Sequence, residues 1–312
     1  MTETASIGRY QPNERAALAE TFDALHLDRL SDLARVDAPE RAAIRAVAYK
    51  GHAPFGPAEM DLLPSLGLIA NYGVGYDAID LDAAQARGVR VTNTPDVLTD
   101  DVADLAIGLW LMQRREMEQA SRWAREGHWK AKGEYRLNTQ ASRGTAGILG
   151  LGRIGRAIAR RLEGFGMEIH YHSRSEKETP GWRYHADPVA LAEAVDTLFV
   201  ALVGGAETEG MVSAEVIHAL GDRGVLVNIA RGSLVDEDAL LDALEAGRIA
   251  GAGLDVFRGE PDIDPRFYAL PSVVIQPHQG SGSRQTRAAM AALQRENVAA
   301  FLDGRDLATP VI

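Results

Sequence analysis

Three residues that could carry chemistry, Arg231, Glu260 and His278, each follow a predicted β-strand in the second half of the chain. A glycine-rich turn with the spacing G-x-G-x-x-G, residues 150–155, precedes them. Hydride transfer to a carbonyl compound needs a bound nicotinamide, an acid that protonates the carbonyl oxygen and a cation that holds an anionic substrate. The turn and the three side chains supply one candidate for each requirement, and together they predict a dehydrogenase site.

The glycine turn follows the apolar run Thr145–Leu149 and opens a predicted helix, Arg153–Leu162. Backbone N–H groups at the start of such a helix can bind a pyrophosphate, so this context predicts a dinucleotide site. The alternative is a tight strand-to-helix turn without a ligand. The predicted cofactor contacts in the turn are Gly150, Gly152, Arg153, Ile154 and Gly155.

The type of dinucleotide depends on the residues about 17 to 20 positions after the last glycine, which are His172, Ser173, Arg174 and Ser175. An NAD site usually has an acid here that accepts the ribose 2′-hydroxyl. An arginine flanked by two hydroxyls can instead bind the 2′-phosphate of NADP through charge-assisted hydrogen bonds. We therefore predict NADP(H) as the cofactor, with NAD(H) as the weaker alternative. The other interpretation is that Arg174 is an ordinary surface arginine.

Each of the three strand-end residues also has an ordinary structural interpretation. His278 could be a loop histidine, Glu260 could cap a turn before Pro261, and Arg231 could be a surface cation. Small, turn-forming residues around His278 favour an imidazole that faces a ligand, and a carboxylate beside it would orient the ring. An arginine followed by glycine at a strand end suits a bidentate carboxylate clamp. We expect all three to act in catalysis.

Length and composition restrict the class of protein. The 312 residues are 46% hydrophobic, enough for two cores, and two domains are expected. Because the chain has no cysteine, it can form neither disulfides nor thiolate metal sites. Its histidines and carboxylates are not clustered in sequence, so they do not predict a metal site either. A net charge of -11 disfavours nucleic acid and acidic membrane surfaces as partners.

No stretch approaches about 20 apolar residues, and the first residues lack a basic segment followed by an apolar run. We therefore expect no membrane association and a cytoplasmic location.

Short apolar runs alternate with amphipathic segments along the chain, as in parallel sheets covered by helices on both faces. The first third is expected to contain strands near Arg45–Lys50, Leu68–Tyr72 and Val89–Thr92, with helices at Pro57–Leu66 and Leu81–Arg87. These elements predict a small α/β domain. Its loop at residues 49–55 is expected to line the substrate pocket.

A long helix is predicted to start after Thr99, whose hydroxyl can cap it, and to run through Trp110 toward Glu126. A second, doubly wound sheet is expected to follow. Its six predicted strands are Thr145–Leu149, Met167–His172, Thr197–Leu202, Val225–Ile229, Ile249–Leu254 and Val273–Ile275.

The carboxyl ends of these strands should bring Gly152, Ile229, Arg231, Asp255 and His278 together. A final helix from about Ser283 to Leu302 is expected to return to the first domain and make it discontinuous. The predicted domains are therefore residues 1–98 with 283–312, which bind substrate, and residues 99–282, which bind NADP.

The motifs as a set resemble those of D-isomer-specific 2-hydroxyacid dehydrogenases over nearly the whole chain. The most specific stretches are residues 150–155, 227–236, 253–257 and 277–278. The segments Gly164–Met167 and Tyr171–Ser175 are most similar to NADP-dependent glyoxylate/hydroxypyruvate reductases. The resemblance implies a flavodoxin-like substrate domain, a Rossmann domain and the reduction of a small 2-keto acid to a D-2-hydroxy acid.

The resemblance also implies the roles of individual residues. Arg231 would bind the carboxylate and carbonyl of the substrate, His278 would be the acid and base, and Glu260 would sustain the protonated imidazole. The N–H groups of Val74 and Gly75 would bind the substrate carboxylate. The residues implied at the nicotinamide end of the cofactor are Asp255 and Gly280, and Ile229 is a further predicted cofactor contact.

Trp110, Trp123 and Trp129 carry more indole surface than one solvated helix and loop can hide, and relatives extend this segment across a two-fold axis. We therefore predict a homodimer in which Trp129 lies near the pocket of the neighbouring subunit. The alternative is that these side chains pack within their own subunit.

Two departures from the family pattern, Val203 and Gln279, leave the preferred substrate open. A dehydrogenase for a bulkier 2-keto acid and an NADP(H)-sensing regulator on the same scaffold are the alternatives. Val74 stands where phosphite-oxidising relatives carry a lysine, which disfavours that activity.

Overall fold

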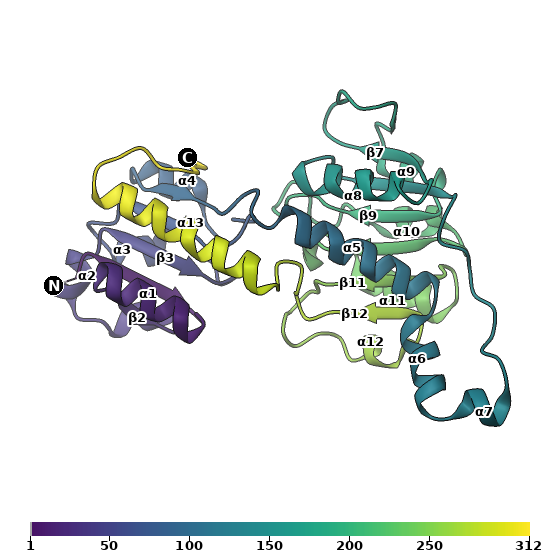
Figure 1. The fold of residues 1–312 in the computed structure, drawn as a ribbon. Coiled ribbons are helices and arrows are strands. Elements are labelled where there is room, and N and C mark those ends of the chain that lie inside the picture. The colour runs from purple at the N-terminus through teal and green to yellow at the C-terminus, as the bar shows by residue number, and fades with distance from the viewer. Residues whose placement is uncertain (1) are drawn as a thin grey trace. The chain divides into compact units, whose positions relative to one another are not determined.

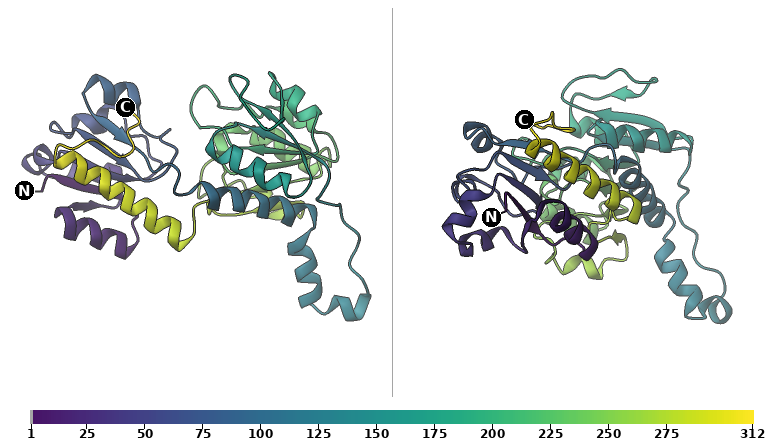
Figure 2. Two further views of the ribbon diagram at one scale, coloured as in Figure 1. Left: turned by 45° about the horizontal axis from the view of Figure 1, so that its top comes forward. Right: turned by 60° about the vertical axis from the view of Figure 1, so that its left-hand side comes forward.

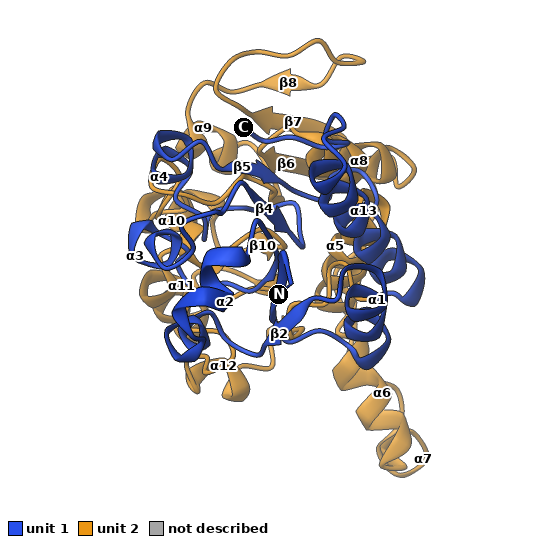
Figure 3. Ribbon diagram, turned by 90° about the vertical axis from the view of Figure 1, so that its left-hand side faces the viewer, with its two compact units in different colours: residues 1–98, 283–312 blue, residues 99–282 orange. Residues whose placement is uncertain are grey.

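The structure is a computed structural model that describes residues 2–312, and the chain forms two compact units (Figure 3). Unit 1 consists of Met1–Leu98 and Ser283–Ile312, and unit 2 consists of Thr99–Gly282. Met1, with which the predicted substrate domain begins, lies outside the described residues.

Unit 1 contains a five-stranded parallel sheet with the strand order β2-β1-β3-β4-β5. This order is that of flavodoxin-like sheets, so the predicted fold class is confirmed for this unit. The strands are β1 Thr4–Gly8, β2 Leu25–Leu27, β3 Ala46–Lys50, β4 Leu68–Asn71 and β5 Arg90–Thr92. The sequence did not predict β1 and β2, because β1 contains threonine, serine and glycine rather than an apolar run and β2 has only three residues.

Helices cover both faces of this sheet. Leu18 of α1 (Pro12–Phe22) and Val298 of α13 (Arg284–Leu302) pack with alanines of β3 on one face. The elements on the other face are η1 Leu30–Arg35, α3 Pro57–Asp61 and α4 Leu81–Ala86. A short helix, α2 (Ala38–Ala43), precedes β3 in the chain. The predicted extension of α3 to Leu66 is wrong, because Pro64 disfavours helical backbone at the residue before it.

The last helix, α13, belongs to unit 1 although more than 180 residues of unit 2 separate it from β5 in sequence. Ser283 caps it, since its Oγ accepts the N–H of Thr286 at 3.2 Å. The helix packs against β3 and β4 and runs beside α1 (Figure 1). The first α/β unit is therefore discontinuous in sequence, as predicted for the fold class.

Unit 2 contains a seven-stranded parallel sheet with the strand order β12-β11-β10-β9-β6-β7-β8. From β6 the sheet extends through β7 and β8 on one side and then through β9 to β12 on the other, as in Rossmann folds. The strands are β6 Thr145–Leu149, β7 Glu168–His172, β8 Arg183–Tyr184, β9 Thr197–Val200, β10 Val225–Asn228, β11 Gly251–Leu254 and β12 Val273–Ile275. The six predicted strands are present, and β8, which was not predicted, has only two residues.

One face of this sheet is covered by α5 (Thr99–Arg114) and α8 (Arg153–Glu163). The other face carries α9 (Pro188–Glu193), α10 (Ala214–Leu220) and α11 (Glu237–Glu245). Short helices η2 (Gly232–Leu234) and α12 (Arg266–Ala269) lie in the connections between strands and helices. No helix within residues 2–312 is both long enough and apolar enough to cross a bilayer.

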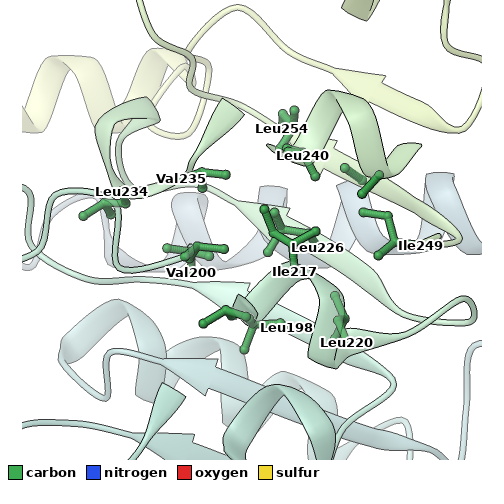
Figure 4. Close-up of a cluster of buried hydrophobic side chains, with 14 of the residues drawn as sticks. Leu198, Val200, Ile217, Leu220, Leu226, Leu234, Val235, Leu240, Ile249 and Leu254 are labelled. Carbon is green, nitrogen blue, oxygen red and sulfur yellow. The ribbon is translucent and has the colours of Figure 1, made fainter. Parts of the chain in front are cut away.

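The main hydrophobic cluster of unit 2 lies under α10 and α11 (Figure 4). Leu198 of β9, Leu226 of β10 and Leu254 of β11 are 2% exposed or less, and they pack with Ile217 of α10 and Leu240 of α11. This cluster fixes the strands whose carboxyl ends carry the candidate site.

The prediction of one long helix from Thr99 toward Glu126 is wrong. The helix begins at Thr99 itself and ends at Arg114, because Glu116 adopts a left-handed conformation (φ 46°). Two further helices follow, α6 (Met117–Arg125) and α7 (His128–Lys132). With the chain up to Arg143 they form an arm, residues 115–143, that extends away from the sheet of unit 2 (Figure 2).

The packing of the main cluster predicts a size-dependent effect at Leu226. Leu226→Ala should lower the free energy of unfolding of unit 2 by about 2–5 kcal/mol, because it leaves a cavity between β10 and α10. Leu226→Met, which conserves volume, should cost less than about 1.5 kcal/mol. Urea titration followed by circular dichroism measures both; equal losses for the two variants would show that Leu226 is not tightly packed.

Candidate active site

The predicted site residues of unit 2 all lie at the carboxyl end of its sheet. They occupy the end of β7, the first turn of α8 and the loops after β6, β7, β10, β11 and β12. Because all seven strands are parallel, these loops emerge at the same edge, which is where α/β sheets bind ligands.

The glycine turn after β6 shows why two of its glycines are required. Gly150 has φ +104°, and a Cβ on it would lie 2.7 Å from the carbonyl oxygen of Ala201. A Cβ on Gly155 would lie 2.1 Å from the carbonyl oxygen of Gly150, so α8 can approach the strand this closely only with glycine. A Cβ on Gly152 would meet nothing within 4 Å. This open space lies at the start of α8, whose first N–H groups are those of Arg153, Ile154 and Gly155.

The segment after β7 forms a small loop held by hydrogen bonds. Nδ1 of His172 donates to the carbonyl oxygen of His185 at 3.0 Å, and Oγ of Ser173 donates to the carbonyl oxygen of Ser175 at 2.6 Å. Ser173 is buried, whereas Arg174 and Ser175 are exposed. The structure therefore uses the Ser173 hydroxyl to shape the loop and presents Arg174 and Ser175 to solvent.

A histidine–carboxylate pair joins the loops after β11 and β12. Nδ1 of His278 donates to Oε2 of Glu260 at 2.8 Å, and Oε1 of Glu260 accepts the N–H of Phe257 at 2.8 Å. The His278 backbone is left-handed (φ 53°), a conformation that costs energy for a residue with a side chain. Because Glu260 engages Nδ1, proton exchange with a ligand must use Nε2.

Asp255 holds the backbone on which His278 is mounted. It is 1% exposed, and its carboxylate accepts the N–H groups of Gln279 at 2.6 Å and Gly280 at 2.7 Å. The N–H of His278 donates to the Asp255 carbonyl oxygen at 2.9 Å. Burial raises the pKa of the Asp255 carboxyl above its ordinary value. A Cβ on Gly280 would lie 3.1 Å from Oδ2 of Asp255, so this contact favours glycine there.

Arg231 lies in a tightly bonded loop after β10. The side chain of Asn228 donates to the Arg231 carbonyl oxygen at 2.9 Å and accepts the N–H of Ala230 at 3.0 Å. A Cβ on Gly232 would lie 2.0 Å from the carbonyl carbon of Phe257. The Arg231 loop thus packs directly on the segment that leads to Glu260. Ile229 is buried beside it.

The predicted substrate-binding residues Val74 and Gly75 lie in the loop after β4 of unit 1. The side-chain amide of Asn71 donates to the Gly75 carbonyl oxygen at 2.9 Å, and that of Asn93 donates to the Val74 carbonyl oxygen at 2.9 Å. The N–H of Thr94 donates to the Gly73 carbonyl oxygen at 2.9 Å. With its carbonyl groups engaged in this way, the loop has its N–H groups left to offer to an anion.

Sequence reasoning missed the two asparagines. Asn71 ends a buried strand and Asn93 follows β5 directly, and this position at strand ends was the available signal. Within residues 2–312, no group of three or more histidine, aspartate or glutamate side chains could hold a metal ion.

A family model, the NAD binding domain of D-isomer specific 2-hydroxyacid dehydrogenases, matches residues 107–280, more than half of the chain. The chain belongs to the D-isomer specific 2-hydroxyacid dehydrogenase family. Its predicted membership is therefore confirmed.

Several proteins similar to this dehydrogenase are named as reductases. The chain is 46% identical over 270 residues to hydroxyphenylpyruvate reductase of Plectranthus scutellarioides, a match that spans 86% of each protein. It is 46% identical over 272 residues to glyoxylate/hydroxypyruvate reductase A of Arabidopsis thaliana, spanning 87% of each. The chain also matches a solved structure of an NADPH-dependent glyoxylate/hydroxypyruvate reductase from Sinorhizobium meliloti in complex with NADP and malonate. The two are 44% identical with a TM-score of 0.94, and the match covers 100% of this chain and 97% of the other.

This dehydrogenase also contains a histidine pair that the sequence did not predict. Nδ1 of His170 and Nε2 of His185 lie 3.0 Å apart, and the two rings stack with centroids 5.1 Å apart. The carbonyl oxygen of His185 also accepts the hydrogen bond of His172, so the pair supports the loop at residues 172–175. Burial lowers the pKa of both His170 and His185 below the ordinary histidine value.

The histidine pair predicts acid sensitivity. Since both pKa values are lower in the folded protein than in the unfolded chain, folding releases protons and stability falls as the pH drops below about 6.5. His185→Gln, which cannot be protonated, should flatten the decrease in unfolding temperature between pH 7 and pH 5. His218→Gln, at an exposed histidine of α10, is the control. If His185→Gln leaves the pH dependence unchanged, the pair does not titrate on unfolding.

Proposed function

We propose that the protein reduces small 2-keto acids, such as glyoxylate or hydroxypyruvate, to D-2-hydroxy acids with NADPH. The observation that carries this proposal is the 2.8 Å hydrogen bond between Nδ1 of His278 and Oε2 of Glu260, in loops packed against the one that holds Arg231. The activities named for the relatives support the same reaction.

Each residue has a distinct role in the proposed reaction. The Arg231 guanidinium binds the carboxylate and carbonyl oxygen of the substrate. His278 donates the proton on Nε2 to the carbonyl oxygen, and Glu260 stabilises the imidazolium before that transfer. The N–H groups of Val74 and Gly75 bind the substrate carboxylate. NADPH, when bound, supplies the hydride for the carbonyl carbon, so that one hydride and one proton convert the carbonyl group into an alcohol.

The residues of unit 2 fit the proposed cofactor. The N–H groups of Arg153, Ile154 and Gly155 would bind the pyrophosphate over Gly152, and Gly150 shapes the turn. The segment from His172 through Ser173 and Arg174 to Ser175 would bind the 2′-phosphate. Ile229, Asp255 and Gly280 would lie at the nicotinamide. Residues 99–282 are accordingly proposed as the NADP-binding domain, and residues 1–98 with 283–312 as the substrate domain.

A panel of 2-keto acids assayed with NADPH and with NADH tests the proposal through the loss of absorbance of the reduced cofactor. Glyoxylate and hydroxypyruvate should be reduced, with NADPH favoured. The relationship to hydroxyphenylpyruvate reductase favours a bulkier 2-keto acid as the second candidate, so phenyl-substituted substrates belong in the panel. Cofactor binding without turnover of any 2-keto acid would instead indicate an NADP(H)-sensing regulator.

The exposed guanidinium after β7 predicts cofactor selectivity. Arg174→Ala should raise the Michaelis constant for NADPH at least about tenfold, because a charge-assisted hydrogen bond to the 2′-phosphate is lost, and should leave that for NADH nearly unchanged. Initial-rate kinetics with both cofactors measure the difference. Equal responses would show that Arg174 does not bind the phosphate.

The position of His278 predicts a loss of turnover without a loss of cofactor binding. His278→Ala should lower kcat about 10²–10⁴-fold, the usual contribution of a general acid, while NADPH still binds with its wild-type dissociation constant. Fluorescence titration with NADPH provides that second measurement. A variant that retains wild-type kcat would remove His278 from catalysis.

The pair with Glu260 predicts a change in the pH profile. Reduction needs the protonated imidazole, and the negative charge of Glu260 favours that form. Glu260→Gln removes the charge, so the rate of reduction should begin to fall at a lower pH than in the wild type. The measurement is kcat/KM for the keto acid between pH 5 and pH 10, and an unchanged profile would contradict the role of Glu260.

We also propose a cytoplasmic homodimer in which the arm covers the partner subunit. Trp129 is 68% exposed and Leu137 is 98% exposed, and no residue between 115 and 143 is buried in the chain alone. This apolar surface supports an interface. Trp110, in contrast, is fully buried against Phe165 and Phe199 within unit 2, as the alternative of packing within its own subunit predicts for this residue.

The exposed indole of the arm predicts that Trp129→Ala weakens dimerisation or changes the relative rates with small and bulky 2-keto acids. Light scattering at micromolar concentration should give twice the 33.6 kDa mass of the chain for the wild type. Trp182→Phe, at a buried tryptophan outside the arm, is the control and should remain dimeric. A monomeric wild type would refute the assembly, whatever the variant does.

A further inference from the structure

The sheet of unit 1 has its own topological switch point, between β1 and β3. The chain leaves β1 toward α1 on one face of the sheet, and it leaves β3 toward α3 on the opposite face. β1 and β3 are neighbours and parallel. Ligands of open α/β sheets bind outside the carboxyl ends of the strands at such a point.

A polar cluster lies at these strand ends. Lys50, the last residue of β3, donates from Nζ to Oε2 of Glu14 at 2.6 Å, and the hydroxyl of Tyr72 donates to Oε1 of Glu14 at 2.6 Å. The N–H of Gln11 also donates to Oε2 of Glu14. Glu14 is 6% exposed, so its carboxylate is buried and both of its oxygens are engaged.

A second cation, Arg287 in the first turns of α13, borders the same tyrosine. Its guanidinium carbon lies 5.9 Å from the centre of the Tyr72 ring, and Nζ of Lys50 lies 4.3 Å from that centre. The Tyr72 hydroxyl also donates to the Arg287 carbonyl oxygen at 3.1 Å. Burial lowers the pKa of Lys50, its hydrogen bond and charge interaction with Glu14 raise it, and the charge of Arg287 lowers it.

The cluster therefore holds two cations and one carboxylate, and Lys50 and Tyr72 already engage that carboxylate. Within residues 2–312 the Arg287 side chain forms no ion pair, although it is half-buried. A half-buried cation without a counter-ion is costly, and its contact with an aromatic ring offsets only part of that cost. In a chain with a net charge of -11, this local excess of positive charge favours an anion.

Tyr72 directly precedes the Gly73–Gly75 loop, whose N–H groups we assign to the reacting carboxylate. The Tyr72 ring that both cations approach is therefore only one residue away from the start of that loop. We propose that Arg287, supported by Lys50, forms a subsite for a second anionic group, a carboxylate or phosphate at the far end of the 2-keto acid. Glu14 positions Lys50, and Arg287 makes the contact that determines specificity. This inference rests on the proposed reductase function.

Matched substrates test the subsite. With NADPH, the wild-type kcat/KM should be higher for 2-oxoglutarate than for 2-oxopentanoate, and higher for phosphohydroxypyruvate than for hydroxypyruvate. Arg287→Gln should lower kcat/KM for the doubly anionic substrates about tenfold or more, mainly through KM, and change that of the neutral-tailed ones less than about twofold. Arg284→Gln, exposed in the same turn of α13, should leave all four values unchanged.

Either of two results would overturn the subsite: a wild type that prefers the neutral-tailed substrates, or an Arg287→Gln variant that loses both kinds equally. Calorimetric titration of the wild type with glutarate and with pentanoate tests it without the variant or turnover, and glutarate should bind more tightly. Equal affinities would refute the subsite. If no 2-keto acid is reduced but glutarate is favoured, the proposed function fails and the anion subsite stands.

Discussion

The hydrogen bond between Nδ1 of His278 and Oε2 of Glu260 is the interaction on which the site depends, since it determines which imidazole nitrogen can face a substrate. It joins loops from two neighbouring strands, so it forms only when β11 and β12 are in register. To place its side chain in this way, His278 adopts a left-handed backbone conformation, which costs conformational energy. Asp255 offsets that cost by accepting the next two N–H groups of the chain.

The same dependence on close backbone contacts extends through the rest of unit 2. Glycine at 232 lets the Arg231 loop lie against the backbone that leads to Glu260, and glycine at 155 lets α8 lie against the turn after β6. The positions of His278, Arg231 and the glycine turn are thus fixed by the packing of one parallel sheet. In unit 1 the side-chain amides of Asn71 and Asn93 hold the loop whose N–H groups are proposed to bind the substrate carboxylate.

Much of this could be predicted from the sequence, because strands buried on both faces appear as apolar runs and the chemistry-bearing residues follow them directly. β1, β2 and β8 were missed, since small polar residues or a length of two or three residues leave no such run. The end of α5 was missed because the residue with left-handed backbone just after it is Glu116. Glutamate, unlike glycine or proline, gives no sequence signal for the end of a helix. The pairing of Lys50 with Glu14 and the contact of Arg287 with Tyr72 join residues far apart in sequence, which no local pattern encodes.

The central claim is that this constellation directs a hydride to the carbonyl carbon while His278 protonates the oxygen. Reduction of glyoxylate or hydroxypyruvate with NADPH deuterated at C4 of the nicotinamide, on the face from which transfer occurs, tests it most directly. Proton NMR of the product should show one deuterium at C2, and for hydroxypyruvate the product should be the D enantiomer. A product without deuterium from NADPH deuterated on either face, or with the L configuration, would contradict the account.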